Sequence, residues 1–148
     1  MTRAAITIIM LALATPAACS AQAPQDGTRM MIAAPPGTAK DLGSAAGDPA
    51  ATALAALVAR QIGGDYRIQS ARFFRMQAVI GWNSVSKFVA GQRSSTGMPP
   101  SPRFHDGGLD LIDLYPAEGG KPAFAVAMAQ EPLADGGKLV GYFELGPP

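Results

Sequence analysis

The spacing of apolar residues changes from a helical to a strand-like period near residue 64, and this change limits the fold more than any other feature. Before it, apolar side chains recur at three- and four-residue intervals and so form one stripe along a helix. The residues of this stripe are Leu54, Leu57, Val58 and Ile62. Asp48 suits the N-cap, because its carboxylate can accept free amide hydrogens of the first turn. Pro49 suits the first helical position, and Gly63-Gly64 ends the helix.

After this helix the apolar residues alternate, which predicts a strand. The alternating residues are Phe74, Met76, Ala78, Ile80 and Trp82. Residues 84–90 look like a returning strand, although Trp82, Val85 and Val89 also suit a helical turn. The sequence predicts a long loop over residues 92–108, and strand-like runs follow at 109–115, 123–130 and 138–145 with turn-forming residues between them. The sequence therefore predicts an α+β domain in which one N-terminal helix packs across an antiparallel sheet of four to five strands.

The N-terminus has the organisation of a secretory signal peptide. Arg3 supplies a short positive region, residues 4–14 are apolar, and residues 15–19 are mostly small. The apolar run is too short to span a membrane comfortably. We therefore expect residues 1–19 to direct export, with the mature protein in the periplasm, on the outer membrane or outside the cell.

The chain has a single cysteine, Cys19, at the end of this signal. Residues 17–19 resemble the end of a bacterial lipobox, although Pro16 stands where an aliphatic residue is usual. Lipidation of Cys19 and ordinary cleavage after Ala21 are the two alternatives. If Cys19 is lipidated, the absence of aspartate at Ser20 implies sorting to the outer membrane. The lipid would then be the expected membrane contact.

Composition divides the remainder into a tether and a domain. Residues 20–47 are rich in Ala, Pro, Gly and Ser without a helical or strand period, which predicts a flexible tether, and residues 48–148 form the domain. The net charge of +1 gives no reason to expect nucleic-acid binding. Bases predominate in residues 66–104 and acids in residues 105–148. This distribution predicts either cross-strand charge pairs or a basic binding surface.

One short motif carries functional information. Gln77, Val79 and Gly81 form the pattern Q-x-V-x-G, and the residues around it resemble the first hairpin of the cystatin superfamily of cysteine protease inhibitors. The flanking residues that carry this resemblance are Tyr66, Ala71, Phe74, Asn83, Lys87, Ala90 and Gly91. Farther along, Pro132-Leu133 stands where the family usually has Pro-Trp, followed by a final strand from Lys138. The resemblance covers about a hundred residues.

The resemblance implies a reversible inhibitor of papain-like cysteine proteases. In that family an apolar wedge of three parts plugs the protease cleft. Carried over to this chain, the parts are the turn of Gln77, Ala78, Val79, Ile80 and Gly81, the pair Pro132-Leu133, and an N-terminal glycine, which is Gly37 or Gly43. Glycine at position 81 would allow the backbone to close the hairpin turn. A monomer without catalytic activity, cofactor or metal is expected.

Three other interpretations stay open from the sequence. Residues 78–80 also suit an ordinary buried strand with Gly81 in a bulge. Leu133 in place of an aromatic residue, and the absence of a Gly-Gly pair before the helix, favour an envelope interaction module that does not inhibit proteases. His105, with acidic residues after it at Asp106, Asp110 and Asp113, suits either a solvated loop or a small metal-dependent hydrolase.

Overall fold

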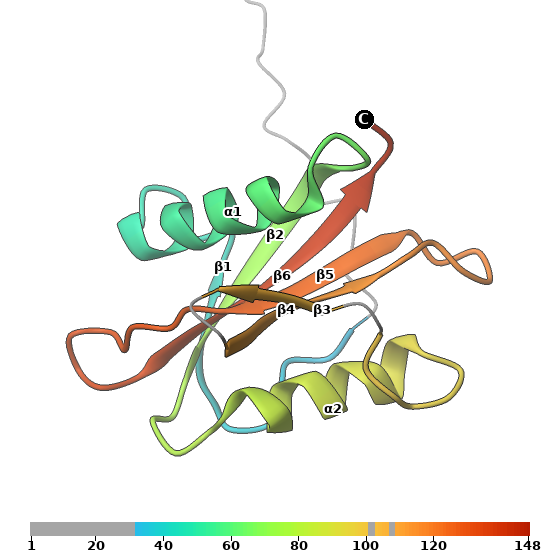
Figure 1. Ribbon diagram of the computed structural model, residues 1–148. Coiled ribbons are helices and arrows are strands. Elements are labelled where there is room, and N and C mark those ends of the chain that lie inside the picture. Colours follow the sequence, from blue (N-terminus) through green and yellow to red (C-terminus); the bar gives the residue numbers. More distant parts are fainter. Residues whose placement is uncertain (1–31, 101–102, 107–108) are drawn as a thin grey trace, which may run out of the picture.

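The computed structural model describes residues 32–100, 103–106 and 109–148, which form one antiparallel sheet and two helices (Figure 1). In chain order the elements are β1 (Thr38–Gly43), α1 (Pro49–Ile62), β2 (Arg67–Met76), α2 (Trp82–Arg93), β3 (Arg103–Asp106), β4 (Leu109–Tyr115), β5 (Ala123–Met128) and β6 (Lys138–Gly146). The sheet has six strands in the order β1-β2-β6-β5-β4-β3. The predicted α+β class, with the first helix across an antiparallel sheet, is confirmed.

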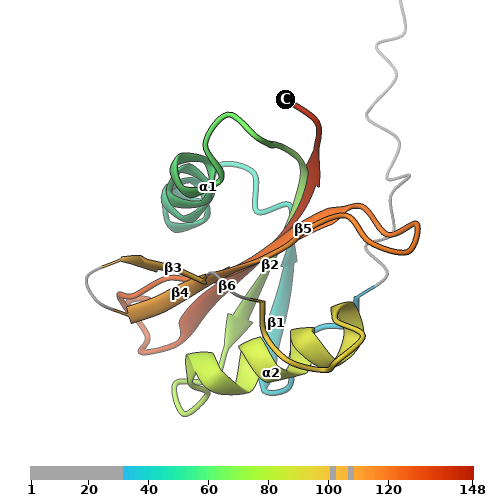
Figure 2. The same ribbon diagram turned by 45° about the vertical axis from the view of Figure 1, so that its right-hand side comes forward.

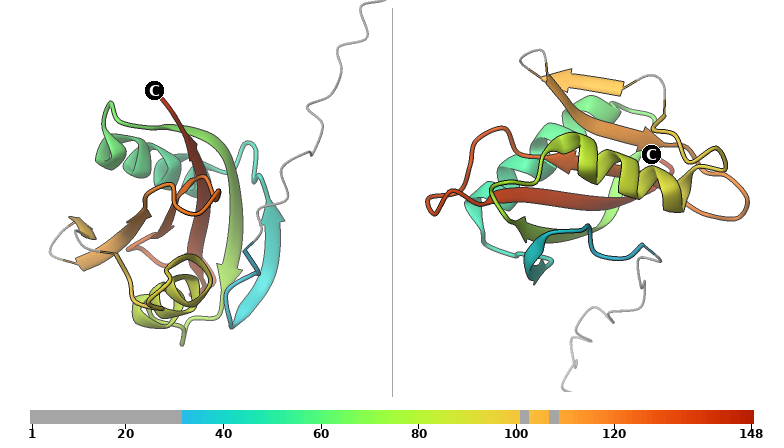
Figure 3. Two further views of the ribbon diagram at one scale, coloured as in Figure 1. Left: turned by 90° about the vertical axis from the view of Figure 1, so that its right-hand side faces the viewer. Right: turned by 90° about the horizontal axis from the view of Figure 1, so that it is seen from below.

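The two helices lie on opposite faces of the sheet, so the domain has three layers (Figures 2 and 3). β5 shows why both faces need a cover, because every one of its residues is buried. Its alanines at 123, 125 and 127 belong to the cluster under α1, while Phe124, Val126 and Met128 belong to the cluster under α2. Small side chains under α1 and large ones under α2 therefore follow from the two-residue period of this strand.

Helix α1 forms as its sequence predicts. The Asp48 side chain accepts a hydrogen bond from the Ala51 amide at 3.0 Å, and a proline occupies the first turn. The buried side chains of the helix are Ala51, Leu54, Val58 and Ile62. Gly63, with φ of +59°, ends the helix in a conformation that favours glycine. The cap, the apolar stripe and the terminator therefore agree in placing α1 at these residues.

Two segments differ from their predicted structure. Residues 84–90 are part of helix α2 and not of a returning strand, because Val85, Val89 and Ala90 meet the sheet on one helical face. Residues 38–43, assigned to the tether, form the edge strand β1, and Ile32 before it is buried. An edge strand is held by backbone hydrogen bonds to its neighbour. Its sequence therefore need not alternate.

The register of the sheet brings three connections to one end, the Met76 end. Met76 is the last residue of β2, and it pairs with Thr38 at the start of β1 and with Lys138 at the start of β6. The pairing of Met128 with Val140 places the end of β5 there too. Consequently residue 37, the turn after β2 and the β5–β6 connection (residues 129–137) all lie at this end (Figure 1).

Candidate functional site

The motif residues form an exposed turn between β2 and α2. The Ile80 amide donates to the Gln77 carbonyl at 3.1 Å, which closes a four-residue turn around Ala78 and Val79. Val79 is 85% exposed, the highest value among the exposed large apolar side chains of the described residues. We call residues 77–81 the motif turn. It is not the buried strand that the alternative interpretation of residues 78–80 required.

Gly37, the turn residue before the edge strand β1, holds the motif turn in place. Its carbonyl accepts a hydrogen bond from the Gln77 amide at 3.0 Å. A Cβ atom at position 37 would lie 2.4 Å from Cγ1 of Ile80, so the Ile80 side chain packs directly on the glycine. Gly37 also has φ of +76°, which side chains disfavour. The motif turn is thus held by backbone and side-chain contacts before any partner arrives, which lowers the entropy lost on binding.

The contacts decide which of the two candidate N-terminal glycines, Gly37 or Gly43, lies beside the motif turn. Gly43 lies at the other end of β1, where it pairs with Phe73, and a Cβ atom at position 43 would have no neighbour within 4 Å. Gly37 contacts the motif turn directly. Of the two predicted N-terminal glycines, Gly37 is therefore the one that shares a surface with the motif.

The last residue of the motif has a different role from the predicted one. Gly81 has φ of −92° and ψ of 162°, an extended conformation that other residues adopt, and it is the N-cap of α2. A Cβ added there would meet nothing within 4 Å. Neither a hairpin turn nor a bulge requires glycine at this position. The motif turn leads into a helix because Trp82, Val85 and Val89 continue at helical spacing.

The second predicted contact, Pro132-Leu133, lies at the same end of the sheet but faces the other way. Leu133 is half-buried and packs against the cluster under α1, whereas Ile80 packs against the cluster under α2. The β5–β6 connection is closed by a hydrogen bond of 2.7 Å from the Leu133 amide to the Gly137 carbonyl. Asp135 forms an ion pair with Arg75 of β2. The two predicted contacts are therefore neighbours that diverge to opposite faces.

Two ion pairs hold β2, one to the β5–β6 connection and one to the edge strand β1. Arg75–Asp135 links a base of the basic segment to an acid of the acidic one, but Asp135 lies in the β5–β6 connection, so this is not the cross-strand pair that the charge distribution predicted. Arg72 binds Asp41 of β1, and its hydrogen bonds hold the pKa of Asp41 below the usual range. Both side chains of the Arg72–Asp41 pair are about two-fifths exposed, so water screens the interaction.

Sequence reasoning missed a buried polar pair beneath α2. The Ser86 hydroxyl donates to a carboxylate oxygen of Asp113 at 2.5 Å, and both residues have no exposed surface. This pair joins α2 to β4. Because it is sealed from solvent, it cannot meet a substrate, and its chemistry is that of a satisfied polar contact in the core. The serine one position after Val85, on the inner face of a helix, was the signal.

The histidine-centred interpretation finds no support in the described residues. The side chains of His105, Asp106 and Asp110 lie outside them, and Asp113 is bound to Ser86 in the core. Within the described ranges, no three metal-binding side chains gather. Residues 1–31, with the signal and Cys19, are likewise outside the description. Neither α1 nor α2, the helices that the structure describes, has the length and hydropathy needed to cross a membrane.

Comparison of the chain with family models, curated proteins and solved structures finds no match. The site therefore has to be interpreted from its own geometry. That geometry is a rigid turn with an exposed aliphatic tip, supported by Gly37, at the Met76 end of the sheet.

Proposed function

We propose that this protein is an exported binding module without catalytic activity, and that it holds a protein partner through the motif turn. The observation that carries the proposal is Val79, which is 85% exposed at the tip of a turn fixed by Gly37 and Ile80. Exposed aliphatic side chains are common singly. One held on a rigid, protruding turn has the properties of a contact residue.

The expected affinity is limited by the size of the contact. Full burial of a valine side chain contributes about 1.5–3 kcal/mol, and a rigid turn loses little conformational freedom on association. Aromatic and arginine side chains usually dominate strong interfaces, and the motif turn has neither. The motif turn thus suits reversible binding in which it enters a recess of the partner.

A papain-family cysteine protease is the partner that the sequence resemblance favours. Its narrow cleft would accept a blunt aliphatic tip, and the contact between Gly37 and the motif turn supports two of the three wedge parts. The third part has less support, because Leu133 is half-buried against α1. We therefore propose inhibition that depends on Val79 and does not depend on Leu133.

The partial burial of Leu133 against the cluster under α1 favours a second candidate function. A module with one contact turn instead of a continuous ridge suits a cell-envelope protein with a shallow recess, and no protease inhibition then follows. Both candidates place Val79 at the centre of the interface. They differ in the partner, so one pair of variants tests both.

The first experiment titrates papain with the purified protein and follows hydrolysis of a small fluorogenic substrate. Val79→Asp should abolish inhibition, because a charge at the tip cannot enter an apolar cleft without losing its hydration. Met98→Asp is the matched control, since Met98 is the other exposed large apolar side chain at 66%. Both variants should unfold within about 0.5 kcal/mol of the parent protein. An absence of inhibition at tens of micromolar removes the protease as partner.

The second experiment replaces Val79, and separately Met98, with a photo-crosslinking amino acid in the exporting cell. A protein captured only from position 79, and lost when Gln77 is also changed to Glu, would identify the envelope partner. Identical products from the two positions, together with no papain inhibition, would contradict the proposal for the motif turn itself.

A further inference from the structure

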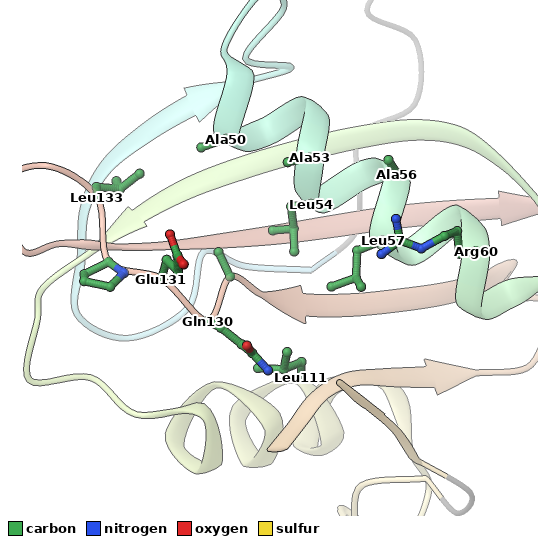
Figure 4. Close-up of a pocket in the computed structure, with 12 residues that line it drawn as sticks. Ala50, Ala53, Leu54, Ala56, Leu57, Arg60, Leu111, Gln130, Glu131 and Leu133 are labelled. Atoms are coloured by element: carbon green, nitrogen blue, oxygen red, sulfur yellow. The ribbon is translucent and has the colours of Figure 1, made fainter. Parts of the chain in front are cut away.

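A groove on the opposite face of the sheet from α2 has no role in the function proposed above. It lies between α1 and the β5–β6 connection and has a volume of about 490 Å³ (Figure 4). This volume lies within the range of small-molecule sites, about 300–1,000 Å³. Leu54 and Leu111 are its buried residues, and Leu57 and Leu133 are half-buried at its sides. We call it the α1 groove.

Two features of the chain shape this space and make its lining apolar. Half of the α1 residues along the groove are alanines, at positions 50, 53 and 56, whose short side chains cannot fill it. In the sheet, the register between β3 and β4 shifts so that Phe104 faces Ile112 and His105 faces Asp110. Leu111 is therefore the extra residue of a bulge, and it joins Ile112 in the cluster under α1. A strictly alternating strand would have directed Leu111 to the other face.

Each end of the α1 groove carries one charged side chain, a base at one end and an acid at the other. Arg60 lies in the last turn of α1, and Figure 4 shows its guanidinium turned back toward Leu57. In the part of the chain that the structure describes, Arg60 forms no ion pair. Glu131 lies on the β5–β6 connection at the other end. A guanidinium offers two parallel hydrogen bonds to a carboxylate.

We propose that the α1 groove binds a free monomeric amphiphile with one apolar chain and a carboxylate head, with the head at Arg60. The leucines and alanines contact the chain, and the guanidinium binds the head. A cationic head group would have only Glu131, on a loop, as its partner. An amphiphile without a charged head group would leave Arg60 without a ligand. The carboxylate is therefore the head group that the groove favours.

The test uses dodecanoate below its micelle concentration, with the purified protein in a calorimeter. We expect saturable binding of one molecule per chain. Ala50→Leu puts a larger side chain at a half-buried position of the groove lining and should weaken binding at least about tenfold, since an occupied site loses most of its apolar contact. Ala59→Leu is the matched control on the same helix, because Ala59 is exposed and does not line the groove. It should bind within about twofold of the parent protein.

The charge is tested separately from the groove. Arg60→Gln should weaken dodecanoate binding about two- to fivefold, because Arg60 is exposed, and should leave dodecanol binding unchanged. Arg67→Gln, at an exposed base outside the groove, should change neither. Equal binding by the Ala50→Leu variant and the parent protein would overturn the proposal. So would co-sedimentation with phosphatidylglycerol vesicles without any binding of monomeric dodecanoate, because the surface would then be a membrane contact. These measurements do not involve Val79. A failure of the groove proposal would therefore leave the function proposed for the motif turn unaffected.

Discussion

Replacement of Gly37 by alanine tests whether the motif turn is held in place by its neighbour. Two costs add in the folded protein. The positive φ of +76° disfavours a side chain by about 1–2 kcal/mol, and the new Cβ would lie 2.4 Å from Ile80 Cγ1, an overpacking cost of about 1–3 kcal/mol. The unfolded chain loses conformational freedom, which returns about 0.4–1 kcal/mol. Together these terms give a net loss of about 1–5 kcal/mol in unfolding free energy, centred at about 3 kcal/mol.

Gly43→Ala separates the two costs. Gly43 also has a positive φ, +61°, but no atom lies within 4 Å of the position that its Cβ would occupy. It should therefore lose only the backbone term, about 1 kcal/mol after the gain in the unfolded state. The difference between the two variants measures the contact with Ile80.

A double-mutant cycle with Ile80→Ala completes the test. Ile80 is half-buried, so its truncation alone should cost about 1–2 kcal/mol, less than for a fully buried isoleucine. In the double variant the smaller side chain leaves room for the new methyl group. The two losses should then sum to about 1–2 kcal/mol more than the double variant shows.

Urea unfolding supplies the free energies, followed by the fluorescence of Trp82, the single tryptophan, which adjoins the motif turn. Equal losses for Gly37→Ala and Gly43→Ala, or additive losses in the cycle, would refute the reasoning. The motif turn would then have no support from the contact between Gly37 and Ile80. The entropic argument for its binding role would fail with it.

Three further predictions concern other parts of the fold. Gly81→Ser should stabilise the protein by about 0.5 kcal/mol in the same urea assay. Gly81 is an N-cap in an extended conformation, and a serine side chain there can accept a hydrogen bond from a helix amide. A loss of stability would contradict the extended backbone at this position. Ser86→Ala should cost about 1–3 kcal/mol by removing the hydroxyl that donates to the buried Asp113 carboxylate at 2.5 Å, whereas Ser84→Ala at an exposed position of α2 should be nearly neutral. Burial raises the pKa of Tyr142 above the ordinary value near 10, so its contribution is complete below pH 10 and is lost as the pH rises toward the raised pKa. Tyr142→Phe should therefore flatten the fall in stability between about pH 10 and 12.

The parts of the fold that the sequence predicted are those with strong side-chain patterns. Helix α1 has a cap, a stripe and a terminator, and all three are seen. The runs near residues 109–115, 123–130 and 138–145 are β4, β5 and β6. β5 also carried a signal that the prediction did not use. A strand without any polar residue has to be covered on both faces, and that requirement implied a second helix.

The second helix was misassigned because its pattern was ambiguous. Trp82, Val85 and Val89 fit a helix, but the family resemblance favoured a strand after the motif. Local spacing was the better guide, since the helical face is what buries Val85 and Val89. A motif of three residues fixes a short turn at most. It contains no information about the element that follows.

The pairing of Gly37 with the motif turn has no signature in the sequence, and the reason lies in how the contact is made. The hydrogen bond joins a backbone amide to a backbone carbonyl, so any residues could supply it. Only the close approach of Ile80 requires glycine, and that approach depends on the register of β1 against β2, which contains two irregularities. Glycines at 37 and 43 were therefore equivalent in sequence. The register of an edge strand decides which of them supports the site, and a change in that register would move the support away from Val79.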